Sequence, residues 1–133
     1  MIWTNGVDEI LLSREKYTTI IDGSGVLVDP RGIDRAELTR LAKARKMISE
    51  FDTSKLSRDG FRVLVDQMDV KLPSGETIAN GMNFRNTYHL RAQAMCFVPC
   101  GGRPEAIELS NVGSLIIDGK CKIAYIVEGA NLY

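Results

Sequence analysis

Three apolar stretches decide the fold, and each ends in a polar loop that contains glycine. They read TTIIDGSG at residues 18–25, MCFVPCGG at residues 95–102 and IAYIVEGAN at residues 123–131. The opening part of each stretch is short and apolar without strict alternation, which predicts a strand buried on both faces. Helical connections are predicted between the three strands. The pattern therefore indicates an α/β fold with a parallel sheet covered on both sides.

The three polar loops are expected to lie together. The carboxyl ends of the strands in an open parallel sheet share one edge, and ligands bind at that edge. Glycine also recurs at strand ends simply because turns need it. A ligand site and a set of ordinary turns are both compatible with this pattern.

The remaining segments predict a helix and a small β insertion within one continuous unit. Asp34 is expected to be a helix N-cap, because Glu37 follows three residues later as in a capping box. That helix is expected to run to about Ile48. Residues 61–78 contain short β-rich pieces around a turn, and are predicted to form the insertion.

Composition excludes several classes of protein. The 133 residues suit one domain, and 17 basic residues balance 17 acidic ones, which argues against attachment to nucleic acid by bulk charge. No apolar run approaches the length of a membrane span, and the first residues do not resemble a signal peptide. We therefore expect an intracellular protein. Three cysteines (Cys96, Cys100 and Cys121) and one histidine (His89) lack the spacing of a zinc site, so free thiols and no metal are expected.

Asp22 is the residue whose chemistry suggests a ligand. Gly23 and Gly25 resemble the start of a dinucleotide fingerprint, but Val28 replaces the third glycine and no helix follows at once, so this is not a phosphate loop. An acidic residue at a strand end can instead accept hydrogen bonds from the adenosine ribose, and its charge disfavours a 2′-phosphate. The alternative is that Asp22 caps the turn, since Asp followed by Gly is a turn signal.

Four segments resemble the cofactor domain of large NAD-specific glutamate dehydrogenases. They are residues 97–107, 125–132, 20–34 and the excursion over 50–87, which smaller glutamate dehydrogenases lack. They occur in the family's order and spacing, and the resemblance covers roughly residues 9–133. It implies a single partial NAD-binding domain over residues 1–133, forming part of a Rossmann-like doubly wound, mostly parallel sheet.

The resemblance also implies an activity and a set of cofactor contacts. The activity is oxidative deamination of L-glutamate to 2-oxoglutarate and ammonia, with hydride passed to NAD. By position, Asp22 with Gly23 matches the residues that meet the adenosine ribose. Pro99, Cys100 and Gly101 match the loop beside the nicotinamide, and Gly129 and Asn131 match residues near the nicotinamide end of the cleft.

Residues 1–133 lack the family's glycine-rich phosphate loop, its substrate domain and its catalytic lysine. We therefore expect no catalytic residue in this chain and no activity from it alone. We also expect its binding of NAD to be weak or absent. The rest of the dehydrogenase polypeptide is the expected partner, in the cytoplasm or mitochondrion. An uncovered sheet edge also predicts a homo-oligomer. The alternative is a stand-alone, non-catalytic module that binds a nucleotide or a partner protein.

Overall fold

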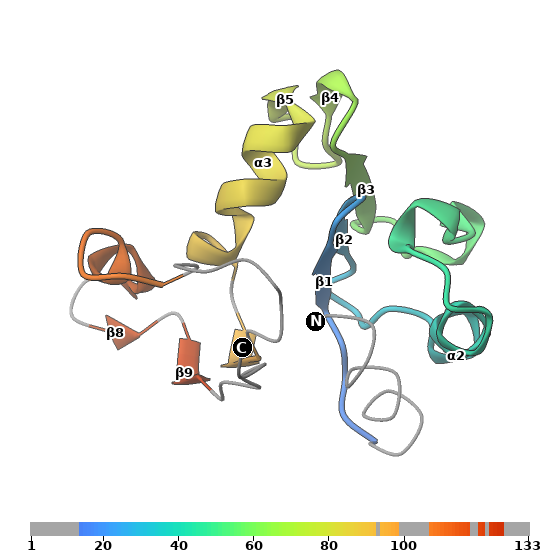
Figure 1. The fold of residues 1–133 in the computed structure, drawn as a ribbon, viewed down its shortest axis with the longest axis horizontal. Helices are drawn as coiled ribbons and strands as arrows, with labels where there is room; N and C mark the ends of the chain where they lie inside the picture. Colours follow the sequence, from blue (N-terminus) through green and yellow to red (C-terminus); the bar gives the residue numbers. More distant parts are fainter. Residues whose placement is uncertain (1–13, 93, 99–106, 118–119, 122, 127–133) are drawn as a thin grey trace.

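The computed structural model describes residues 14–92, 94–98, 107–117, 120–121 and 123–126 (Figure 1). Within these ranges the chain forms several small sheets joined by short helices, and a mixed α/β fold is confirmed. Most strand pairs are antiparallel, and only β6–β9 is a parallel pair among the described residues. The described residues do not show the doubly wound parallel sheet.

The first sheet contains β1 (Thr19–Asp22), β2 (Gly25–Val28) and β3 (Phe61–Leu64) in the order β1-β2-β3. Both pairs are antiparallel. The prediction that the first apolar stretch is a parallel strand beside the other two is therefore not supported by the described residues. Its connection to β2 is a two-residue turn, whereas a parallel partner needs a crossover of about a dozen residues.

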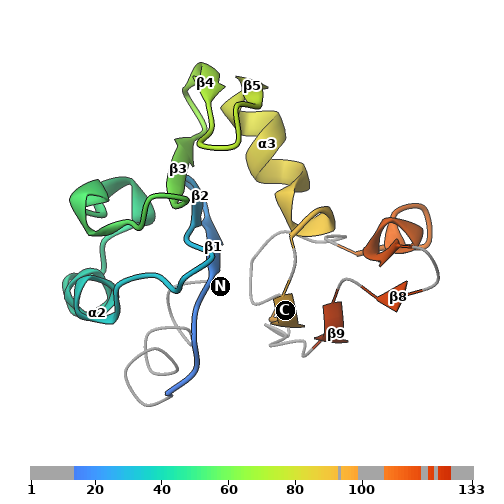
Figure 2. The same cartoon turned by 180° about the vertical axis from the view of Figure 1, so that it is seen from behind.

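Elements pack against both faces of the first sheet (Figures 1 and 2). Helix α2 (Arg35–Ala44) covers one face, and helix α3 (Gly81–Thr87) covers the other. The core on the α2 side contains Ile20, Leu27, Ile33, Leu38, Leu41, Ile48 and Phe51. The core on the α3 side contains Val26, Val28, Val63, Leu72, Ile78 and Phe84. Alternate residues of β1–β3 thus point to opposite cores, as strand geometry requires.

Helix α2 begins as the sequence predicts but ends earlier. The Asp34 carboxylate accepts a hydrogen bond of 2.8 Å from the Glu37 amide, so the capping prediction is confirmed. Arg45 then takes a left-handed conformation with φ 52°, and its amide bonds back to Ala42. This C-cap ends the helix before Ile48, which starts a separate 3-10 turn, η1 (Ile48–Glu50).

The predicted insertion is divided between two sheets. Its first strand, β3, completes the first sheet, while β4 (Met68–Lys71) and β5 (Thr77–Asn80) form a hairpin. Helix α3 starts directly after β5, because the Asn80 side chain caps it by accepting a 2.9 Å bond from the Asn83 amide. The 3-10 turn η3 (Tyr88–Leu90) follows α3.

The C-terminal elements lie across α3 from the first sheet (Figures 1 and 2). They are β6 (Ala94–Phe97), η4 (Val112–Leu115), β7 (Ile116–Ile117), β8 (Lys120–Cys121) and β9 (Ile123–Ile126). Strands β6 and β9 pair in parallel, which confirms the pairing predicted for the second and third apolar stretches. The burial predicted for both faces of these strands is wrong for the described residues, because Met95, Tyr125 and Ile126 are exposed.

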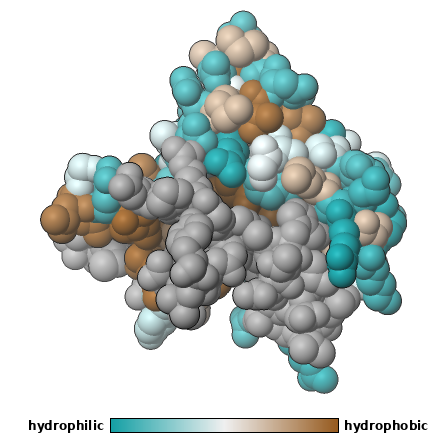
Figure 3. Space-filling view, in the orientation of Figure 1, coloured by the Kyte–Doolittle hydropathy of each residue, from teal (hydrophilic) through white to brown (hydrophobic). Residues whose placement is uncertain are grey.

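Apolar side chains are exposed on these C-terminal elements. Met95 of β6 is 77% exposed, Tyr125 of β9 is 65% exposed, and Leu109, in the turn before η4, is 98% exposed. Figure 3 shows apolar surface gathered on the side of the molecule that carries the C-terminal elements. Parallel strands are normally covered on both faces, so this exposure is unusual for a parallel pair.

Candidate functional site

The candidate site begins at the end of β1, where Asp22 precedes the two-residue turn Gly23–Ser24. The Asp22 side chain is buried, with the residue 2% exposed. Its Oδ1 accepts bonds from the Ser24 amide (2.8 Å) and hydroxyl (2.6 Å), and its Oδ2 accepts one from the Ile48 amide (2.8 Å). The carboxylate therefore caps the turn and also holds the start of η1 beside it.

The Ser24 hydroxyl extends this contact. It accepts a 3.1 Å bond from the Ser49 amide while donating to Asp22. The turn after β1 and the start of η1 are thus joined by both side chains. This contact spans about 25 residues of sequence, and no local motif predicted it.

Gly23 is the exposed residue of the turn. The side chain of Met47, itself 47% exposed, lies beside it, with Cε 3.7 Å from the point where a Cβ of Gly23 would be. A ligand that meets this strand end contacts backbone and a thioether, whereas the Asp22 carboxylate lies beneath them. The residues therefore fit a nucleotide ribose only in part, because Gly23 is exposed but the carboxylate of Asp22 is buried and already has protein partners.

Arg85 reaches the same strand end from α3. Its Nε donates a 2.9 Å bond to the backbone carbonyl oxygen of Asp22, and its Nη1 donates a 3.2 Å bond to the Asn86 side chain. The ion pairs found among the described residues do not include Arg85. Sequence reasoning missed this residue, although it lies in the excursion that carried part of the resemblance.

The other predicted contact residues, Pro99, Cys100, Gly101, Gly129 and Asn131, lie outside the described residues. The last residues of the preceding strands, Phe97 of β6 and Ile126 of β9, are register partners in the parallel pair. Roles for the five residues therefore stay predictions.

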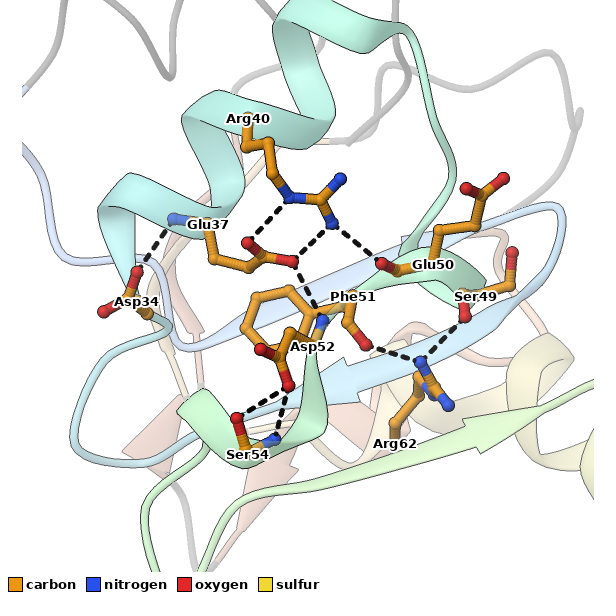
Figure 4. A network of polar contacts seen from close by, with 9 residues as sticks. All are labelled: Asp34, Glu37, Arg40, Ser49, Glu50, Phe51, Asp52, Ser54 and Arg62. Atoms are coloured by element: carbon orange, nitrogen blue, oxygen red, sulfur yellow. Dashed lines mark hydrogen bonds and ion pairs between the residues drawn. The ribbon is translucent and has the colours of Figure 1, made fainter.

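A second polar cluster joins α2 to the segment that follows it (Figure 4). Glu37 accepts bonds from Arg40 Nε (2.9 Å) and Nη2 (2.5 Å), and also from the Asp52 amide (2.9 Å). Arg40 also donates to the Glu50 carbonyl, 3.0 Å away. The hydrogen bond from Arg40 lowers the pKa of Glu37 to about 2.

Arg62 of β3 completes this cluster. Its Nη1 donates 2.8 Å bonds to the carbonyl oxygens of Ser49 and Phe51, so β3 is held to the same segment (Figure 4). The charged groups satisfy one another or the backbone. The cluster is consequently a structural connection between α2, η1 and β3, and its arginines are not arranged around an open site.

Metal-binding groups do not gather in the part of the chain that the structure describes. No three His, Cys, Asp or Glu side chains there are close enough to hold an ion. His89 stacks on Phe97 with ring centroids 5.9 Å apart, and Cys96 is an exposed free thiol. None of the helices in the described ranges is long and apolar enough to cross a membrane.

Comparisons with known proteins give one consistent family. The model of the Glutamate/Leucine/Phenylalanine/Valine dehydrogenase family matches residues 6–133. NAD-specific glutamate dehydrogenases of Neurospora crassa and Saccharomyces cerevisiae are 65% and 57% identical to this chain. A protein named glutamate dehydrogenase 2 from Dictyostelium discoideum is 50% identical.

The three matches each cover 96% of this chain. The chain spans only 12% of the Neurospora and Saccharomyces proteins and 13% of the Dictyostelium protein. No solved structure matches the chain.

Proposed function

Because this chain belongs to the glutamate, leucine, phenylalanine and valine dehydrogenase family, we propose that it is part of the NAD-binding region of an NAD-dependent glutamate dehydrogenase. The observation that carries the proposal is the 57–65% identity to NAD-specific glutamate dehydrogenases over 96% of the chain. The complete polypeptide then oxidises L-glutamate to 2-oxoglutarate and ammonia, and NAD accepts the hydride. Residues 1–133 contribute cofactor contacts to that reaction, and the catalytic groups come from elsewhere in the polypeptide.

Within this proposal, the strand end at Asp22 and Gly23 meets the adenosine ribose. The exposed Gly23 supplies backbone groups, and the carboxylate of Asp22 orients the turn that presents them. Direct contact between the ribose and this carboxylate requires the buried side chain to become accessible, since Asp22 is 2% exposed. The loop with Pro99, Cys100 and Gly101, together with Gly129 and Asn131, is proposed to meet the nicotinamide end.

The ribose assignment is tested by comparing two buried aspartates of the first sheet. Asp22 and Asp29 are 2% and 1% exposed, and each accepts bonds from a serine hydroxyl and from backbone amides. Asp29 lies just beyond the other end of the β1–β2 hairpin, bound to Ser57 and Arg31. It is therefore a matched control for loss of a buried carboxylate.

The experiment measures NADH affinity by fluorescence in the complete polypeptide, with Asp22→Asn and Asp29→Asn compared. We expect Asp22→Asn to weaken NADH binding about tenfold, as for loss of one charged hydrogen bond, and Asp29→Asn to leave it within twofold. Equal affinities in the Asp22 variant and the parent protein contradict the ribose assignment. A parent polypeptide that does not bind NADH contradicts the proposed function itself.

We further propose that the rest of the dehydrogenase polypeptide covers the parallel pair β6–β9. The exposed Met95, Tyr125 and Ile126 support this, because a parallel pair is normally covered on both faces. The chain spans 12% of the Neurospora relative, so a long polypeptide is available in such a protein. Cys96, which is exposed on β6, provides the probe.

Alkylation of native protein followed by peptide mass spectrometry tests this surface. We expect Cys96 to react rapidly in the separate chain, diluted until it no longer self-associates, and slowly in the complete polypeptide. Equal rates contradict the covering. An uncovered face also predicts self-association of the separate chain, so a uniform 14.7 kDa species in sedimentation contradicts the homo-oligomer.

A further inference from the structure

Arg85 connects the excursion over residues 50–87 to the end of β1. It lies on α3, and its Nε bond of 2.9 Å to the Asp22 carbonyl oxygen spans 63 positions of sequence. Asp22 is therefore held from two sides. Its carboxylate accepts from the Ile48 amide, while its carbonyl accepts from α3. The hairpin turn that contains Gly23 is thus held by bonds from both of these distant segments to the residue before it.

Packing of α3 does not itself depend on this arginine. Phe84 of α3 is buried in the second core, and its ring lies 4.9 Å from Tyr88 and 6.3 Å from Phe61, measured between centroids. Gly81 lets the start of α3 approach β3 closely, since a Cβ there would lie 1.9 Å from the Leu64 carbonyl oxygen. These contacts hold the helix against the sheet without Arg85. The bond from Arg85 can therefore fix the position of the strand end relative to α3.

Arg91 shows what a purely structural arginine looks like in the same segment. Both of its terminal nitrogens are bound to the Glu76 carboxylate, at 2.9 and 2.6 Å, and its guanidinium lies over the Phe84 and Tyr88 rings. Arg85 has no carboxylate partner among the ion pairs of the described residues and donates to the backbone of the strand end instead. Arg85 therefore joins α3 to the end of β1, whereas Arg91 joins the end of η3 to Glu76, just before β5.

We infer that Arg85 is a positioning residue for the nucleotide end of the cofactor site. It acts by holding the Asp22 carbonyl, and with it the exposed Gly23 turn, in the position that the cofactor meets. This inference rests on the proposed function. According to this inference, the excursion affects cofactor affinity through the single hydrogen bond from Arg85 to Asp22.

The test compares Arg85→Met with Arg91→Met in the complete polypeptide. Methionine keeps much of the apolar stem and removes the guanidinium, so packing is retained. We expect Arg85→Met to raise the Kd for NADH and the KM for NAD about tenfold, the effect of one charge-assisted hydrogen bond. The kcat and the KM for glutamate should stay within twofold, and Arg91→Met should leave the Kd for NADH within twofold.

Arg85→Lys supplies a second measurement that does not depend on the methionine variant folding normally. Lysine retains the charge and can donate to the same carbonyl, so we expect it to restore most of the NADH affinity. Restoration supports positioning through Asp22.

Three results overturn the inference. They are an unchanged Kd for NADH in Arg85→Met, equal losses in the Arg85 and Arg91 methionine variants, and a matching rise in the KM for glutamate. In each case the parent polypeptide still binds NADH, so the proposed function survives. A parent polypeptide that binds no NADH overturns both.

Discussion

The contact between Glu37 and Arg40 makes a prediction that is specific in both size and pH dependence. Glu37 is 8% exposed, and its carboxylate accepts two bonds from Arg40 and one from the Asp52 amide. Replacing Glu37 with Gln keeps the shape of the side chain but removes its charge. It also sets an amide NH₂ against one of the donors that surround it.

The expected magnitude follows from the pKa of Glu37. Arg40 lowers it from the ordinary 4.5 to about 2, so the folded state binds this proton less readily than the unfolded state. The stabilisation is fully present above pH 4.5 and is lost as the pH falls toward 2. The full shift corresponds to about 3 kcal/mol. Because half of the Arg40 side chain is exposed to screening solvent, we expect about 1.5 kcal/mol.

Hydrogen exchange of residues 48–55 measures this contribution, since the Asp52 amide itself donates to Glu37. At pH 6 the segment should open about 1.5 kcal/mol more easily in Glu37→Gln than in the parent protein. The difference should shrink steadily as the pH is lowered below 4.5, because protonated Glu37 resembles the variant.

Glu50→Gln is the matched control. Glu50 pairs with Lys46 at 3.2 Å, and about half of each side chain is exposed, so its loss should change the opening free energy by about 0.5 kcal/mol or less. The reasoning is refuted if the Glu37 variant differs from the parent equally at pH 6 and pH 3.5. It is also refuted if the two variants have equal effects.

Further predictions concern packing and the excursion. Gly25→Ala places a Cβ 2.2 Å from a backbone oxygen of β3, and we expect it to lower the free energy of unfolding in urea by about 3 kcal/mol. Gly113→Ala is the control, because no atom lies within 4 Å of its new Cβ, and it should lower that free energy by less than about 0.5 kcal/mol. Glu76→Gln removes the exposed ion pair with Arg91 and should cost about 1 kcal/mol or less in the same assay. Burial raises the pKa of the Tyr88 phenol, so ultraviolet titration should show a tyrosine that ionises above the ordinary range, and the absence of such a tyrosine contradicts the packing.

Local chemistry accounts for the parts of the fold that the sequence predicts well. Asp34 and Glu37 are three residues apart, and their cap depends on nothing further away. Strands β6 and β9 were recognisable as short apolar runs without alternation. The family was recognisable because four segments kept its order and spacing.

Distant contacts account for most of what the sequence did not predict. The two-residue turn after Asp22 was visible, but the pairing of β2 with β3 joins strands separated by more than thirty residues. Helix α3 begins with Gly81, a poor helix former, and is held by the packing of Phe84 in the core. The bond from Arg85 to Asp22 likewise has no local signature.

The two kinds of strand pairing also set an order of events during synthesis. The β1–β2 hairpin needs a turn of only two residues, and β3 completes its sheet by Leu64, long before the C-terminal elements are made. Strand β6 ends at Phe97, and its partner β9 begins at Ile123, about 26 positions later, which at the usual pace of translation is a delay of roughly one to five seconds. During that interval the nascent chain presents Met95 and its apolar neighbours without their parallel partner. The nascent chain is therefore open to association through the unpaired edge of β6 until β9 has been made.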